Sequence, residues 1–388
     1  MNTISKSSAE SSSLAIKLRK AVHGEVFFDD FSRGRYATDA SFYQIMPVGV
    51  VVPKTRDDVE TTLAIAREEG VSILPRGGGT SQSGQTVGAS LVLDMSKYLN
   101  QLISFDEEAK TCEVEPGIVL DHLNARLKSQ NLWFPVDVST ASRATIGGMA
   151  GNNSCGTRSI RYGIMRDNVL SLDAILPDGS KNHFGLRDDS DSSTQLVREL
   201  LTIGERDAAE IAANFPNLPR RVGGYNVDAL VPGDKDINLA ELMVGSEGTL
   251  GLTTRLRLKL SPLPQNKVVG VCHFPTFYGA MDAAQHIVRL GPTAVELVDR
   301  TIMELARDIP LYRKVVEGFV RGRPDALLLV EFAEDEQAEN LSRLKQLGQL
   351  MGDLGFENAV VEVIDPAAQK AVWEVRKSGL NIVMSMKS

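Results

Sequence analysis

The stretch PRGGGTSQSGQ occupies residues 75–85 and directly follows an apolar segment, residues 73–75, that we expect to form a β-strand. Its three consecutive glycines, residues 77–79, can adopt positive φ angles and turn successive main-chain N–H groups toward an anion. Thr80, Ser81 and Ser83 can add hydroxyl donors to the same loop. The stretch therefore predicts a phosphate-binding loop at the end of a strand.

Two common phosphate-binding patterns fit this loop poorly. The Rossmann pattern G-x-G-x-x-G does not match, because the next glycine after residues 77–79 is Gly84. The Walker spacing G-x-x-x-x-G runs from Gly79 to Gly84, but Gln85 stands where a lysine must answer the charge of the β- and γ-phosphates. Taken alone, the loop leaves open a failed Walker site, a failed Rossmann site and a plain glycine turn.

Two further segments share this composition. Small residues and amides dominate residues 135–168, which contain TIGG at 145–148 and GNNSCG at 151–156, and GSEGTLG follows at 245–251. A long stretch with little regular structure inside a globular domain is usually functional. We call residues 76–85, 145–156 and 245–251 the first, second and third glycine segments. Together they predict a long, extended and polar cofactor.

The bulk composition excludes several classes of protein. The chain has 388 residues, 43% of them hydrophobic and 24% charged, with a net charge of −8. Such a surface repels nucleic acid, and no apolar run reaches the roughly 18–20 residues that cross a bilayer. The first 20 residues are serine-rich rather than apolar, which favours a disordered lead over a secretory signal. We expect a cytoplasmic protein, or one attached peripherally to the inner membrane, without a transmembrane segment.

The cysteines and histidines show no metal-binding pattern. Cys112, Cys155 and Cys272 are far apart and form no C-x-x-C pair, so we expect neither an iron–sulfur cluster nor a zinc site in this chain. The five histidines are also scattered, which favours surface or core roles for each.

The order of apolar segments predicts the domains. A chain of this length exceeds one hydrophobic core. We expect a lead at 1–40, a cofactor-binding domain at 41–262 with lobes at about 41–105 and 106–262, and a last domain at 263–388. Residues 252–260 alternate apolar and polar side chains, which is typical of an amphipathic edge strand. After residue 262 the order strand, helix, strand, then strand, helix, strand predicts a ferredoxin-like α+β domain. The final helix has no stop signal, so we expect this domain to be truncated.

In type and order, residues 76–84, 145–148, 162–169 and 245–252 resemble the vanillyl-alcohol-oxidase-type FAD-binding fold. More narrowly, the chain resembles the FAD-linked D-2-hydroxy-acid dehydrogenases, which act on D-lactate, glycolate or D-2-hydroxyglutarate. The likeness runs from about residue 40 to 388. Residues 36–43 and 373–387 are similar to the N-terminal part of long bacterial enzymes that add a C-terminal iron–sulfur module. The resemblance implies a two-lobed FAD-binding domain followed by an incomplete ferredoxin-like substrate domain.

The resemblance also implies the cofactor and its contacts. Relatives with covalent flavin carry histidine where this chain has Thr80, so we expect noncovalent FAD, with Cys155 as the alternative attachment point. The first glycine segment would wrap the diphosphate, and residues 137–168 would line the ribityl chain and the flavin ring. The residues implied to bind FAD are Arg76, Gly77, Gly78, Gly79, Thr80, Ser81, Gly84, Gln85, Asp137, Thr140, Thr145, Gly147, Gly148, Asn152, Ser154, Gly156, Tyr162, Gly163, Asp167, Asn168, Val169, Glu247, Gly248, Gly251 and Leu252.

The implied reaction oxidises a D-2-hydroxy acid to the 2-oxo acid by hydride transfer to FAD. In the family an arginine of a W-x-x-R pattern holds the substrate carboxylate, and Trp373-Glu-Val-Arg376 matches it; the alternative is an arginine on a solvated helix face. The family's catalytic base and metal-ligand histidines would lie beyond residue 388, as would any iron–sulfur cluster. The implied electron acceptor is an iron–sulfur module, a quinone or a carrier protein. The competing hypotheses are a nucleotide-binding module without redox activity and a UDP-sugar enolpyruvyl reductase-like flavoenzyme.

Overall fold

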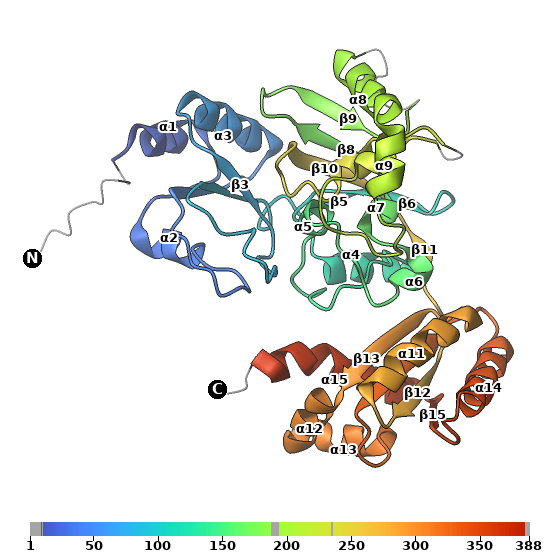
Figure 1. Ribbon diagram of the computed structural model, residues 1–388. Coiled ribbons are helices and arrows are strands. Elements are labelled where there is room, and N and C mark those ends of the chain that lie inside the picture. Colours follow the sequence, from blue (N-terminus) through green and yellow to red (C-terminus); the bar gives the residue numbers. More distant parts are fainter. Residues whose placement is uncertain (1–8, 10, 188–193, 234–235, 385–388) are drawn as a thin grey trace, which may run out of the picture. The chain divides into compact units, whose positions relative to one another are not determined.

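The computed structural model describes residues 9, 11–187, 194–233 and 236–384. The chain divides into two compact units, which are described separately below (Figure 1). The first unit contains Met1–Gly156 and Gly163–Pro262, and the second contains Thr157–Tyr162 and Leu263–Ser388. The short stretch Thr157–Tyr162, which carries helix α6 (Ser159–Tyr162), therefore interrupts the first unit and packs with the second.

The first unit begins with a four-stranded sheet in the order β1-β2-β4-β3. Strands β2, β4 and β3 are parallel, and β1 is antiparallel at the edge. β2 and β4 are buried along their whole length, as expected for apolar parallel strands covered on both faces. Its elements are α1 (Ser13–Ala21), β1 (Glu25–Phe27), α2 (Asp30–Arg35), β2 (Gly49–Val52), α3 (Arg56–Glu68), β3 (Ile73–Arg76) and β4 (Leu91–Asp94).

The disordered lead predicted for the first 20 residues is wrong for residues 13–20, which lie in α1. Ser12 accepts a hydrogen bond from the main-chain N–H of Ala15 and so begins α1, which buries Leu14 and Leu18 against α3 and the sheet. One residue of this serine-rich stretch, Ser12, therefore acts as a helix cap. Strand β1 then extends the sheet, so this part of the chain belongs to the first domain.

The second sheet of the first unit is antiparallel, in the order β5-β6-β10-β8-β9. Strand β10 shows the predicted alternation of buried and more exposed residues, but it is a central strand, hydrogen-bonded to β6 and β8. The edge-strand prediction is wrong, because alternation reports one buried face and says nothing about neighbours. Strand β5 starts at residue 102, so this sheet begins slightly before the expected lobe boundary at 105.

Helices pack on this sheet to close the second core of the unit. The sequence pattern predicts one helix around 195–213 after a polar stretch at 188–194. The structure instead has two helices that meet at Asp207, and residues 188–193 lie outside the described residues. The elements are β5 (Leu102–Asp106), β6 (Thr111–Val114), α4 (Leu120–Leu127), η1 (Lys128–Gln130), β7 (Leu132–Trp133), α5 (Ile146–Gly151), α7 (Met165–Asn168), β8 (Val169–Ile175), β9 (Lys181–Phe184), α8 (Gln195–Arg206), α9 (Ala208–Asn214), η2 (Val227–Leu230), α10 (Ala240–Met243), β10 (Leu252–Lys259) and β11 (Ser261–Pro262).

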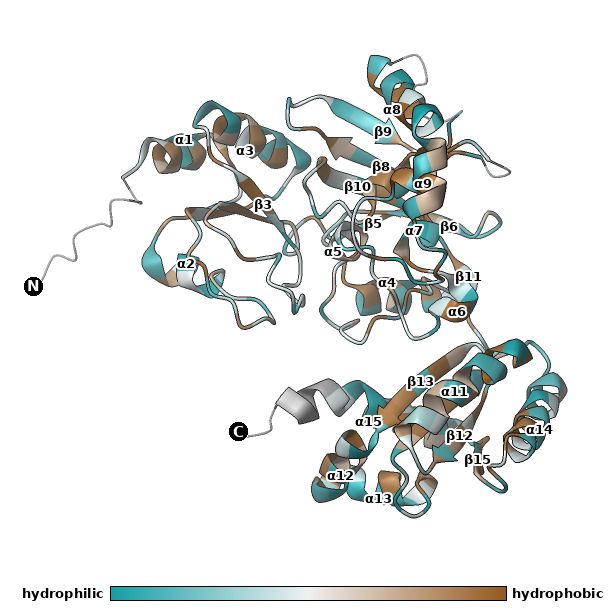
Figure 2. Cartoon of the chain, in the orientation of Figure 1, coloured by the Kyte–Doolittle hydropathy of each residue, from teal (hydrophilic) through white to brown (hydrophobic). Residues whose placement is uncertain are grey.

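The second unit is a four-stranded antiparallel sheet in the order β13-β14-β12-β15, the ferredoxin-like arrangement that the element order predicts. One hydrophobic cluster lies between the sheet and α12, α13 and α15, and another lies on the α11 and α14 face. Figure 2 shows the strands mainly in hydrophobic colours and the helices in mixed ones. The elements are β12 (Val268–Phe274), α11 (Phe277–Ile287), η3 (Val288–Leu290), β13 (Ala294–Asp299), α12 (Arg300–Asp308), α13 (Pro310–Phe319), β14 (Ala326–Phe332), α14 (Gln337–Asp353), β15 (Val360–Val363) and α15 (Pro366–Met384).

Among the described residues, no helix is both long enough and apolar enough to cross a membrane.

Candidate functional site

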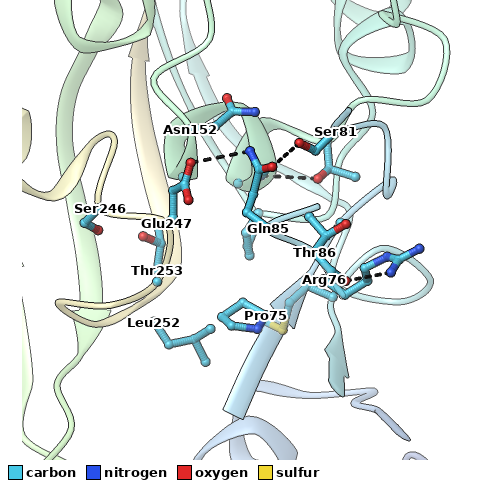
Figure 3. A pocket seen from close by; sticks show the side chains of 18 of the residues that line it. Pro75, Arg76, Ser81, Gln85, Thr86, Asn152, Ser246, Glu247, Leu252 and Thr253 are labelled. Carbon is cyan, nitrogen blue, oxygen red and sulfur yellow. Dashed lines mark hydrogen bonds between the residues drawn. The ribbon is translucent and has the colours of Figure 1, made fainter. Parts of the chain in front are cut away.

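The three glycine segments meet at one pocket within the first unit (Figure 3). The first segment enters from the end of β3, the second from the start of α5, and the third from the chain before β10. The predicted site residues that line the pocket are Arg76, Gly77, Ser81, Gln85, Thr145, Gly147, Gly148, Asn152, Glu247, Gly248, Gly251 and Leu252.

Eight lining residues were not predicted as site residues. Five of them lie inside or beside the glycine segments and could have been found by widening those segments: Pro75, Thr86, Gly151, Ser246 and Thr253. The other three come from stretches whose sequence carries no functional signal: Met95, Pro116 and Met243. Only the packing of the two sheets of this unit brings these three to the pocket.

The glycines are needed mainly because two main-chain segments approach each other closely. A Cβ atom on Gly77 would lie 2.1 Å from Oγ1 of Thr145, and one on Gly78 would lie 2.2 Å from the carbonyl oxygen of Arg143. Of the three consecutive glycines, only Gly79 has a positive φ, of 61°. The first and second glycine segments therefore pack with no room for side chains between them.

The donors of the first glycine segment fit a diphosphate. Within the described part of the chain, the main-chain N–H groups of residues 77–81 donate no hydrogen bond to another residue. Residues 77–81 are partly or fully exposed, so these N–H groups are accessible to an anionic ligand. Such a donor set fits the phosphate groups of a dinucleotide.

A short chain of side chains links the first and third glycine segments. Ser81 donates a hydrogen bond to Oε1 of Gln85, and Nε2 of Gln85 lies 3.4 Å from Oε1 of Glu247 (Figure 3). Glu247 has a φ of 52° and is followed by Gly248 at 79°. Gln85, which replaces the Walker lysine, therefore connects the two walls of the pocket.

Arg76 has a different role from the expected one. Its guanidinium donates hydrogen bonds of 2.8 Å to the main-chain carbonyls of Thr86 and Thr38, and it lies over the ring of Tyr36 at 5.8 Å. In Figure 3 it points away from Asn152 and Glu247. Burial lowers the pKa of this guanidinium. The side chain thus fastens the loop to neighbouring carbonyls, while the N–H groups that follow it remain open to the phosphates.

Residues 36–43 brace the first glycine segment from outside. The main-chain N–H of Ala40 donates to the carbonyl of Gly79 at 3.1 Å, and Oγ1 of Thr86 donates to Asp39 at 2.8 Å. A Cβ atom on Gly84 would lie 2.3 Å from the ring of Tyr43. In the sequence, only the resemblance to relatives drew attention to residues 36–43. Their role in bracing the first glycine segment follows from tertiary contacts.

The remaining predicted cofactor residues do not line the pocket. Most of them shape the chain locally: a Cβ on Gly156 would meet Asp137 at 2.2 Å, and Asp167 accepts a hydrogen bond from the N–H of Ile164 at the start of α7. Tyr162 belongs to the second unit. The full set is Gly78, Gly79, Thr80, Gly84, Asp137, Thr140, Ser154, Gly156, Tyr162, Gly163, Asp167, Asn168 and Val169.

Arg376 lies on α15 in the second unit and is only partly exposed. Its Nε and Nη2 atoms both donate to Oε2 of Glu296 on β13, at 2.9 and 2.5 Å. A carboxylate of this chain therefore already binds one edge of the guanidinium that the resemblance assigns to the substrate. The alternative of a solvated helix face is wrong, because Arg376 is only partly exposed and its partner Glu296 is almost fully buried.

A second buried ion pair lies on the same sheet face. Arg158 donates to both carboxylate oxygens of Glu331, at 2.6 and 2.7 Å, and its guanidinium stacks on Trp373 at 5.5 Å. Glu331 is 1% exposed, so the two charges depend on each other. Trp373 and Arg376 are therefore anchored by two glutamates of neighbouring strands.

The described residues contain no group of three or more His, Cys, Asp and Glu side chains that could hold a metal ion. His273, for example, is buried and accepts a hydrogen bond from the N–H of Arg321. Cys155 is partly exposed, while Cys112 and Cys272 are buried, and all three are free thiols.

Comparison with known proteins identifies both parts of the chain. Residues 47–185 match the FAD binding domain family, and residues 263–387 match the C-terminal domain of the FAD linked oxidases. The D-2-hydroxyglutarate dehydrogenase of Pseudomonas putida is 31% identical over 93% of this chain and 38% of the relative. The glycolate oxidase subunit GlcD of Bacillus subtilis is 29% identical over 94% of this chain and 68% of the relative. The chain thus spans little more than a third of the dehydrogenase.

Solved structures share the fold at low identity. Alkyldihydroxyacetonephosphate synthase superposes with a TM-score of 0.67 at 19% identity, covering 92% of this chain and 62% of that one. Physcomitrella patens BBE-like 1 gives 0.60 at 16% identity, with coverage of 91% and 62%. The fold is therefore the vanillyl-alcohol-oxidase-type FAD-binding fold. The chain therefore contains an FAD binding domain followed by a domain that matches the C-terminal domain of the FAD linked oxidases.

Proposed function

We propose that this chain holds FAD noncovalently in the pocket of the first unit and takes part in the oxidation of a D-2-hydroxy acid to the 2-oxo acid. The observation that carries the proposal is the convergence of three glycine segments on one pocket with an open run of N–H donors. Relatives named D-2-hydroxyglutarate dehydrogenase, glycolate oxidase subunit and D-lactate dehydrogenase support the class of substrate.

Different pocket residues would contact different parts of FAD. The N–H groups of Gly77 and Ser81, which line the pocket, and those of residues 78–80 between them would bind the diphosphate, since a row of main-chain donors suits anionic oxygens. Gly147 and Gly148 would let the cofactor pass close to the main chain of α5, and residues 246–252 would close the opposite wall. Thr80 offers no ring nitrogen for a covalent bond, which supports a noncovalent cofactor.

When bound, FAD supplies the acceptor for the hydride that leaves C2 of the hydroxy acid. The protein must hold the substrate carboxylate and receive the hydroxyl proton. We propose Arg376 for the carboxylate. Glu296 binds its Nε and Nη2 atoms, and Nη1 donates to no other described residue, so one edge of the guanidinium stays available.

For the electrons we propose transfer to an iron–sulfur module, a quinone or a carrier protein. The match of residues 263–387 favours this group over a UDP-sugar enolpyruvyl reductase-like enzyme. Gln85 in place of the Walker lysine disfavours a nucleotide-hydrolysing loop, because no cation at that position answers the charge of the β- and γ-phosphates.

A visible spectrum tests the proposal directly. Purified protein, incubated with FAD and passed through a desalting column, should keep the absorption bands of oxidised flavin and release them into the supernatant after acid precipitation. A protein that keeps no flavin contradicts the proposal, and flavin that stays with the precipitate contradicts noncovalent binding.

The substrate class is tested by anaerobic bleaching of those bands. D-Lactate, glycolate and D-2-hydroxyglutarate are added separately, with the L-isomers of the chiral acids as controls. Bleaching by at least one of the three acids, without bleaching by the L-isomers, is the expected result. No bleaching by any of them rejects hydroxy-acid oxidation by this chain.

A further inference from the structure

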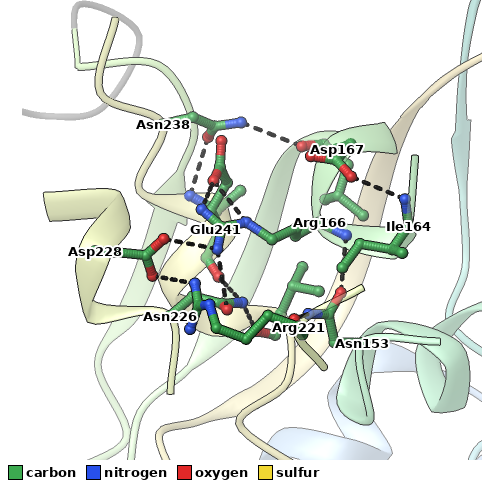
Figure 4. A network of polar contacts seen from close by, with 12 residues as sticks. Asn153, Ile164, Arg166, Asp167, Arg221, Asn226, Asp228, Asn238 and Glu241 are labelled. Carbon is green, nitrogen blue, oxygen red and sulfur yellow. Dashed lines mark hydrogen bonds and ion pairs between the residues drawn. The ribbon is translucent and has the colours of Figure 1, made fainter. Parts of the chain in front are cut away.

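Behind one wall of the FAD pocket lies a network of charged and amide side chains centred on Arg166 (Figure 4). Nε and Nη2 of Arg166 donate to Oε2 of Glu241, the first at 2.9 Å. Nη1 donates to Asp228 at 3.0 Å and to Asn226 at 3.1 Å. One guanidinium therefore holds three side chains, from the start of α10, from η2 and from the residue before η2.

The ion pairs of the network lie within the first unit. Asp228 also pairs with Arg221 at 2.5 Å, so two arginines face two carboxylates. The side chain of Arg166 is 15% exposed. Removing one partner of such a pair leaves a poorly solvated charge, so the four groups stabilise one arrangement. Arg166 has the most partners among them.

One arm of the network reaches the second glycine segment. The main-chain N–H of Arg166 donates to Oδ1 of Asn153 at 3.0 Å. Asn153 is fully buried, has a φ of 50°, and directly follows Gly151 and Asn152 in the pocket wall. A non-glycine residue rarely adopts this conformation, so it must be held by its surroundings.

The other arm reaches the third glycine segment. Nδ2 of Asn226 donates to the main-chain carbonyls of Glu241 and Val244, at 3.0 and 2.8 Å. Val244 directly precedes this segment, whose N–H groups at Gly245 and Glu247 donate to the carbonyls of residues 150 and 151 at 2.8 and 2.9 Å. Both arms therefore end on the two adjacent main-chain segments, residues 150–153 and 244–247, that form this wall.

We propose that Arg166 is a positioning residue for FAD, which sets the shape of this wall before the cofactor binds. It acts through its side chain at Asn226 and through its main-chain N–H at Asn153. The proposal rests on FAD binding in the pocket. Arg166 does not line the pocket itself, so it acts through main-chain segments that do. If the wall is ordered before FAD binds, binding does not have to supply the free energy of ordering it. The affinity for FAD is therefore higher.

The test measures FAD affinity in flavin-free protein. FAD is titrated into the wild type, Arg166→Met and Arg166→Lys, and binding is followed by calorimetry. The matched control is Arg255→Met, because Arg255 on β10 also joins two carboxylates of this unit, Asp173 at 2.9 Å and Glu113 at 3.3 Å, without lining the pocket. Thermal unfolding of each flavin-free variant records the loss of stability separately.

The expected result is a rise in the FAD dissociation constant of about tenfold or more for Arg166→Met, a smaller rise for Arg166→Lys, and a change within about threefold for Arg255→Met. If Arg166→Met binds FAD like the wild type, or if Arg255→Met weakens it equally, the positioning role is overturned. If Arg166→Met does not fold, Glu241→Gln is judged by the same criteria. A wild type that binds no FAD rejects the proposed function itself, which is a distinct outcome.

Discussion

The glycine pocket of the first unit and the arginine corner of the second unit, formed by Arg158, Arg376, Glu296 and Glu331, were both reached from short motifs, yet they differ in what the motif revealed. In the pocket, glycines mark where main-chain segments approach each other, and the segments do meet. At the corner, the W-x-x-R pattern found an arginine whose guanidinium is already bound by a glutamate far away in the sequence. A motif of glycines indicates where the main chain must turn or pass close to another segment. A motif of charged or aromatic side chains does not indicate which residues those side chains will contact.

The largest effect is expected from breaking the buried pair of the corner. Arg158→Met leaves Glu331 without its cation in a buried position, which should cost about 3–5 kcal/mol of unfolding free energy. The chain has two tryptophans, so in a Trp133→Phe background the fluorescence of Trp373 reports the second unit during denaturant unfolding. The control Arg161→Met removes the more exposed pair with Glu334 and should cost below about 1 kcal/mol. Equal costs would show that burial does not distinguish the two pairs.

The next effect concerns catalysis at the same corner. Loss of a charged hydrogen bond to the substrate carboxylate is worth about 1.5–3 kcal/mol, so Arg376→Met should lower kcat/KM of the full reaction about ten- to hundredfold. Arg343→Met is the control, since Arg343 pairs with Glu339 and Glu334 in the same unit. If Arg376→Met loses stability but keeps its kcat/KM, Arg376 only neutralises Glu296 and does not bind the substrate. The arginine corner would then be a structural feature, unlike the glycine pocket.

The pocket is tested by filling the space between its main-chain segments. Gly78→Ala would place a Cβ 2.2 Å from a main-chain oxygen and should cost about 1–3 kcal/mol of stability, together with a marked loss of FAD affinity in a titration. Gly88→Ala is the matched control, because its Cβ would meet no atom closer than 3.6 Å. If both substitutions are tolerated alike, close approach does not explain the glycines.

The smallest effect involves Asp58, a carboxylate that serves main-chain donors. Burial raises the pKa of Asp58, but hydrogen bonds from the N–H groups of His23, Lys54 and Thr55 outweigh it and hold the pKa below its usual value. A lowered pKa gives stability that is present above the unfolded value of about 3.9 and is lost as the pH falls through the folded value. Asp58→Asn should therefore lower the unfolding free energy by about 1 kcal/mol at neutral pH. The difference from wild type should shrink in acid, and a difference that is constant with pH would contradict this reading.

Much of the fold was predictable, because local patterns suffice for single elements. The acidic residues and apolar spacing after Thr55 predict a capped helix at 55–69, and α3 does begin after the cap Thr55. Strands β2, β3 and β4 lie where short apolar runs place them. The wrong predictions concern which elements lie next to each other in the fold. Strand β10 is central although its alternation resembles an edge strand, and α1 and β1 are ordered because the sheet and α3 provide a surface for their few apolar residues.

By itself, then, the sequence determined which segments form the pocket proposed for FAD, since glycine positions follow from main-chain geometry that each segment carries locally. Only the tertiary structure decided which groups face this pocket and which hold its walls. It turned Arg76 toward two carbonyls, brought Met95, Pro116 and Met243 into the pocket, and gave Arg376 and Arg166 their carboxylates. The reason is physical: a buried charge or donor must find a partner, and that partner comes from whichever distant segment the packing brings within reach.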